Sequence, residues 1–176
     1  MDSIYSTSVI NILGFIVGIA LYSLLFAMVW RHRRQDAKID FLLLLTAVLG
    51  LLWNTGELFS FVWRDFFDSS VSPILLAVSY SALGFLPSLV VHSAEDENKK
   101  SRILTITAYG LSVFAAMLHF QSAFSNGNMP SSLAMQILTF GSIALLAGLL
   151  FFNFKQKFEN KTVWIAALSV FALSAF

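Results

Sequence analysis

The feature that most constrains this chain is a series of long apolar runs separated by short polar stretches. A membrane-spanning helix needs about 20 apolar residues to cross a hydrocarbon core of ~30 Å. In lipid, the backbone polar groups must bond within the segment, which favours helices. We therefore predict an all-α fold over residues 1–176, a single transmembrane helical bundle. Its five complete spans cover residues 9–30, 39–63, 73–94, 103–124 and 133–154, and an incomplete sixth covers 162–176.

Composition supports the same class. Hydrophobic residues make up 57% of the chain and charged residues only 12%, which is too little polar surface to coat a soluble domain. The expected partner is therefore the lipid bilayer, and no nucleic acid. The absence of cysteine excludes disulfides, thiolate metal sites and thiol nucleophiles.

The positive charges predict the orientation. Cytoplasmic loops of membrane proteins carry an excess of Lys and Arg. Only Arg64 lies in an even-numbered loop, and the other 10 of the 11 basic residues lie in odd-numbered ones: Arg31, Arg33, Arg34, Lys38, Lys99, Lys100, Arg102, Lys155, Lys157 and Lys161. The N-terminus is therefore expected outside. Because the sixth run is short, we expect the natural chain to continue beyond Phe176.

The second run contains an acid. Thr46, Gly50, Asn54 and Glu57 recur at helical spacing and share one face. A charged acid at mid-membrane costs roughly 2.5 to 3.5 kcal/mol, so Glu57 is expected to face other helices rather than lipid.

Polar residues on other runs lie at a similar depth. Counted from the expected outer boundary at ~1.5 Å per residue, Glu57, His119 and Gln136 lie roughly 6 Å deep and Tyr80 about 9 Å. We predict that these four residues and Asn54 border one ligand-binding cavity. The alternative is that they make separate contacts between helices, since spacing gives depth but not helix rotation.

Small residues and a proline indicate where helices pack. Gly14 and Gly18 form a GxxxG pattern, which favours close packing of helices within the bundle over dimerisation. Gly84 belongs to a stripe of small residues on the third run, and Pro87 predicts a kink there.

Several kinds of cofactor site are disfavoured. His32, His92 and His119 are expected at different depths, which argues against a haem held by two histidines. All lysines lie in loops, which argues against a retinal Schiff base in these runs. No catalytic residue, metal site or cofactor is predicted.

The segments LLWNTGELF and SYSALGFLPSLVVHSA resemble the N-terminal seven-transmembrane input region of bacterial sensor histidine kinases. Leu86, Pro87 and His92 are similar to the LP-x-x-x-x-H run that closes the third helix in that group. The resemblance implies a multi-pass protein of the bacterial cytoplasmic membrane, part of a homodimer or larger complex. It also implies that the kinase domains would follow in the cytoplasm, so this chain would not itself be an enzyme.

The expected function is thus the signal-input region of a two-component system, which responds to a ligand or membrane state by helix rearrangement. The alternative is an integral subunit of a respiratory, photosynthetic or transport complex. Its surface, rich in Phe and Trp, would then contact quinone, pigment or another subunit.

Overall fold

The computed structural model describes residues 2–33, 41–67, 70–93, 99–125 and 129–153, and the predicted sixth run lies outside them. All regular secondary structure in these ranges is α-helical, as predicted. The helices are α1 (Asp2–Arg33), α2 (Phe41–Phe67), α3 (Pro73–Ser93), α4 (Lys99–Phe124) and α5 (Ser132–Asn153).

Four stretches are long and apolar enough to cross a membrane: Val9–Arg31, Phe41–Phe67, Pro73–Ser93 and Arg102–Phe124. Helix α5 is also apolar along its length, and Ser132–Leu145 is an apolar stretch within it. A multi-pass membrane helical bundle is therefore the architecture that the described chain fits.

Three helices extend beyond the predicted apolar runs by three residues or more, and α1 does so at both ends, from Asp2 to Arg33. The second helix continues past Trp63 to Phe67, so Arg64 lies in its last turn rather than in a loop, 3.4 Å from the Asp65 carboxylate. The fourth begins at Lys99, so its first turn is basic. Polar side chains at a helix end can reach water while the backbone still bonds within the helix, so hydropathy underestimates helix length.

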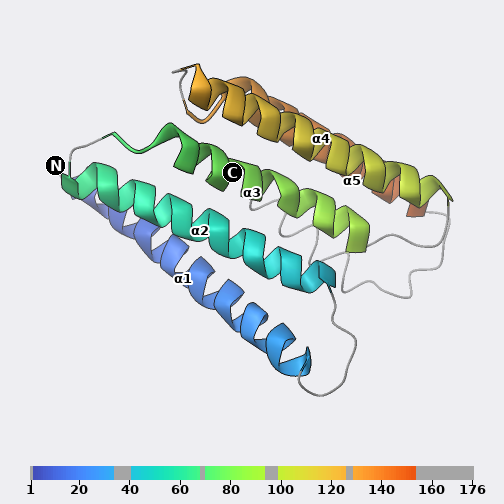
Figure 1. Cartoon of the computed structure of the whole chain (residues 1–176), viewed down its shortest axis with the longest axis horizontal. Helices are drawn as coiled ribbons and strands as arrows, with labels where there is room; N and C mark the ends of the chain where they lie inside the picture. Colours follow the sequence, from blue (N-terminus) through green and yellow to red (C-terminus); the bar gives the residue numbers. More distant parts are fainter. Residues whose placement is uncertain (1, 34–40, 68–69, 94–98, 126–128, 154–176) are drawn as a thin grey trace.

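Successive helices run antiparallel and pack side by side (Figure 1). The contacts are between α1 and α2, α2 and α3, α3 and α4, and α4 and α5, and α3 also touches α5. Helix α3 lies in the middle and is the most buried span, whereas α1 packs mainly on α2 and leaves large apolar side chains exposed. Such exposure carries no penalty in lipid, because lipid tails are as apolar as leucine.

Small residues lie where helices approach most closely. A Cβ atom at Gly56 of α2 would collide with the Ser79 hydroxyl of α3, and one at Gly84 of α3 would press on Leu138 of α5. Gly18 of α1 lies against the Asn54 side chain, whereas no atom lies within 4 Å of a Cβ placed at Gly14. Only the second glycine of the GxxxG pattern therefore makes a close contact within the described chain.

A polar contact joins α3 to α4 beside Pro87. The Ser88 and Ser112 hydroxyl oxygens are 2.6 Å apart, and Ser112 lies 2.7 Å from the Gly84 carbonyl oxygen. Both serines are buried. The Ser112 hydroxyl of α4 thus bonds a backbone carbonyl of α3 about one turn before Pro87.

Candidate functional site

Two residues on the polar face of α2, Gly50 and Asn54, lie against α1. Gly50 and Asn54 are buried, and the Asn54 side-chain amide donates a 2.7 Å hydrogen bond to the Gly50 carbonyl. Thr46 similarly donates to the Leu42 carbonyl at 2.8 Å. The Asn54 side chain, predicted to bind a ligand, therefore acts at least in part in the packing of α1 on α2, through its contact with Gly18.

Glu57 is half-buried on α2. Its Oε1 atom is buried and has no hydrogen-bond partner among the described residues. The carboxyl group interacts electrostatically with Arg64 on the same helix and with Tyr80 on α3. A buried carboxyl oxygen without a partner is costly, so this atom is available to any hydrogen-bond donor that can reach it.

His119 of α4 is fully buried. Neither ring nitrogen has a hydrogen-bond partner in the part of the chain that the structure describes. Its imidazole packs against the Tyr80 ring of α3, with centroids 5.6 Å apart and planes at 31°. Sequence spacing predicted similar depths for these two residues, and the structure places them in direct ring contact.

Tyr80 belongs to a row of rings that crosses four helices, made up of Phe61, Phe15, Trp53, Tyr80 and His119. The successive centroid distances are 6.4, 6.5, 5.1 and 5.6 Å. Trp53 and Phe15 were not among the predicted site residues. Trp53 precedes Glu57 by four residues and therefore lies near it on the helix surface, a spacing that could have identified it.

Gln136 lies apart from this row. It is on α5, which packs mainly on α4, and its side chain is exposed. The structure thus links Glu57, Tyr80 and His119 by ring contact and electrostatic interaction, while Gln136 points away from the protein. A single cavity bordered by all the predicted residues stays a prediction.

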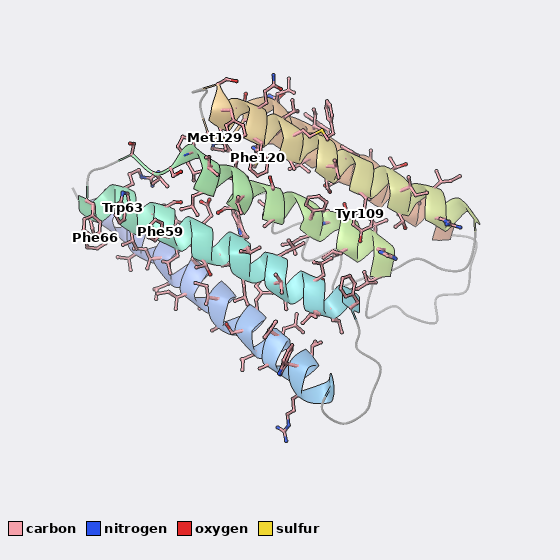
Figure 2. The ribbon with its side chains drawn as sticks, in the orientation of Figure 1. Phe59, Trp63, Phe66, Tyr109, Phe120 and Met129 are labelled. Carbon is pink, nitrogen blue, oxygen red and sulfur yellow. The ribbon has the colours of Figure 1, made fainter. Side chains whose placement is uncertain are left out.

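An aromatic cluster occupies the end of α2, where Figure 2 shows Phe59, Trp63 and Phe66. The Phe59 and Trp63 rings stack with centroids 5.2 Å apart, and Arg64 lies 4.8 Å from the Phe61 ring centroid. Tryptophan and basic side chains are typical of the boundary between lipid and water. The cluster therefore indicates where α2 leaves the membrane.

His92, the last residue of the LP-x-x-x-x-H run, lies toward the other end of α3. Its Nδ1 atom is 3.0 Å from the Tyr109 hydroxyl of α4, and Figure 2 labels that tyrosine. His92 and His119 thus occupy different levels of the bundle. Within the described ranges, no group of three or more acidic or histidine side chains is placed to hold a metal ion.

No protein-family model, curated protein or solved structure matches the chain. The similarity to sensor-kinase input regions therefore remains a prediction based on residues 51–59 and 79–94.

Proposed function

We propose that this chain is the membrane-embedded input region of a two-component sensor kinase, which converts ligand binding or a change in the membrane into helix rearrangement. One observation carries the proposal: Glu57 and His119, from two different helices, have buried polar atoms without described partners on the two helices that flank Tyr80. An unsatisfied buried polar group costs about 1–3 kcal/mol. A ligand or packing arrangement that satisfies these atoms is favoured, and the helix equilibrium shifts toward it.

The contacts around α3 supply a route for such a shift. Tyr80 touches rings from α2 and α4, and Ser88 further along α3 bonds Ser112 of α4. A movement of α4 against α3 at the level of His119 would therefore strain or release the Ser88 contact, which lies nearer the opposite end. Bundles switch in this way when two packing arrangements have similar free energy.

We propose an outer N-terminus, so that this opposite end faces the cytoplasm of a bacterium. The described basic residues support this orientation, since the end of α1 and the start of α4 both carry them at that end of the bundle. Any attached kinase domain would then lie on the side where ATP is available.

The gene sequence after the codon for Phe176 tests the assignment. A further span followed by a phosphorylatable histidine box and an ATP-binding domain would support it. In that full-length protein, Tyr80→Leu should change autophosphorylation in membranes, because it removes the ring that touches both Trp53 and His119. Phe114→Leu, at an exposed position on α4, is the control. A continuation without kinase sequences would contradict the proposal.

The exposed aromatic cluster of α2 favours a second candidate, an integral subunit of an energy-transducing or transport complex. Phe59, Phe66 and Phe67 leave a broad apolar surface on which quinone, pigment or another subunit could pack. Purification in mild detergent separates the two candidates. Visible absorption, extractable quinone or co-purification with a large complex would favour the subunit.

A further inference from the structure

Three titratable side chains from three successive helices are linked within the bundle. Tyr80 of α3 packs against the His119 imidazole of α4 and against Trp53 of α2, which lies one helical turn before Glu57. The other rings of the row, Trp53, Phe15 and Phe61, present mainly hydrocarbon edges and faces. Tyr80 is thus the polar ring that packs on His119, and Glu57 lies on the neighbouring helix α2, four residues after Trp53.

The hydrogen-bonding requirements of these groups are complementary. A neutral imidazole carries one N–H donor and one acceptor nitrogen, a phenol is both donor and acceptor, and a carboxyl group carries a proton or accepts one. Both nitrogens of His119 and one oxygen of Glu57 are buried without a described partner. A proton shared among the three groups would give each of them a hydrogen-bond partner. Water would bridge any two groups that do not touch.

We propose that Glu57, Tyr80 and His119 form a proton-binding site that holds one exchangeable proton between the carboxyl group and the imidazole. In one form the proton is on Glu57 and both end groups are neutral. In the other, the carboxyl O–H bond has broken and a new N–H bond has formed on His119, which leaves a carboxylate and an imidazolium. The Tyr80 hydroxyl or a water relays the proton by giving one and receiving one, so it is unchanged.

The inference rests on the proposed function and deepens it by naming the proton as the ligand. A second proton taken up from water would leave a net positive charge among the helices, and loss of the only proton would leave a negative one. Either net charge is costly within a bilayer. A change in the number of bound protons therefore changes the free energy of the site. The helix arrangement that better accommodates the new charge is then favoured.

Few charged or titratable side chains of the described helices lie near the site. Arg64 of α2 acts electrostatically on both Glu57 and Tyr80, and it pairs with Asp65. Helix α5 contains no acidic or basic residue. The α1 residue Tyr22 lies against Gly50, about two helical turns from Glu57.

Imidazole nitrogen NMR and carboxyl infrared spectra of the full chain in lipid bilayers test the proposal. The chain has three histidines, so His32→Gln and His92→Gln variants assign the signals of His119. We expect the His119 nitrogen signals and a protonated-carboxyl infrared band to titrate with one common midpoint. Glu57→Gln should abolish that band and move the His119 midpoint by about one pH unit or more, because a nearby charge has been removed.

His92→Gln is also the matched control and should leave the His119 midpoint unchanged, since His92 pairs with Tyr109 at another level. Separate midpoints in the wild-type protein would overturn the proposal even if Glu57→Gln failed to fold. An unchanged His119 titration in folded Glu57→Gln would also overturn it. None of these measurements needs a kinase domain, so a failure of the proposed function and a failure of the proton site give different results.

Discussion

The Tyr80 ring on α3 lies 5.6 Å from the His119 imidazole on α4, centroid to centroid, and this contact joins the two helices that pack at the middle of the bundle. His119 has no exposed surface, yet neither ring nitrogen has a partner in the described chain. The imidazole therefore contributes van der Waals packing to the interface and places a polar group within it. Both properties can be measured.

Truncation of His119 should destabilise the bundle. His119→Ala removes a fully buried ring that packs on Tyr80, and large-to-small changes at buried sites cost about 2 kcal/mol or more. Met117→Ala, two residues away on the same helix and 62% exposed, should have little effect. Thermal unfolding of both variants in the same detergent checks the difference. Equal stabilities would show that the packing of the ring contributes no more than the burial of its two unpartnered nitrogens costs.

A methyl group at Gly56 should push α2 away from α3. The added Cβ would meet the Ser79 hydroxyl, and overpacking typically costs about 1–3 kcal/mol. Gly110→Ala is the control, because no atom lies within 4 Å of its Cβ, and it should be neutral or stabilising by up to about 1 kcal/mol. Unfolding curves of the two variants should therefore shift differently. A neutral Gly56→Ala would mean that the two helices are further apart than described.

The Ser88 and Ser112 hydroxyl groups should be energetically coupled. Their oxygens are 2.6 Å apart and buried, and hydrogen bonds between membrane helices are worth about 0.6 kcal/mol on average and at most about 1.7. A double-mutant cycle with Ser88→Ala and Ser112→Ala should give a coupling energy in that range. Thr107→Ala replaces Ser88→Ala in the control cycle, because the exposed Thr107 hydroxyl bonds only its own helix at Ile103. Additive effects of the two serine changes would contradict the pairing.

Reporter fusions should reveal the proposed orientation. With ten of the 11 Lys and Arg residues in odd-numbered loops, a reporter fused after Lys161 is expected to be cytoplasmic and one fused near Asn126 external. Paired reporters that are active on opposite sides of the membrane make the comparison internally controlled. The reverse pattern would place Glu57 and Tyr80 nearer the cytoplasmic surface and would exclude an external source for the proton.

Much of this fold follows from local pattern. The apolar runs predicted α2 to α5 to within about four residues at each end, whereas α1 begins seven residues before its predicted start. A segment in lipid must satisfy its own backbone, so a helix can be predicted without knowledge of its neighbours. Glu57, Tyr80 and His119 could likewise be assigned a depth by counting along each helix. Trp53 was missed because its spacing of four residues from Glu57 was not used, and its residue type alone does not distinguish a site from ordinary packing.

Sequence by itself determined the helices and the order of the polar side chains along each one, since these depend on one segment at a time. Tertiary structure alone decided the rotation of each helix against its neighbours. Gly18 meets Asn54 while Gly14 has no close neighbour, and His119 faces Tyr80 while Gln136 points outward. The physical reason is that almost every face of these helices is apolar and free to face lipid. Rotation is therefore set by the shape and hydrogen bonding of the few residues that meet across an interface.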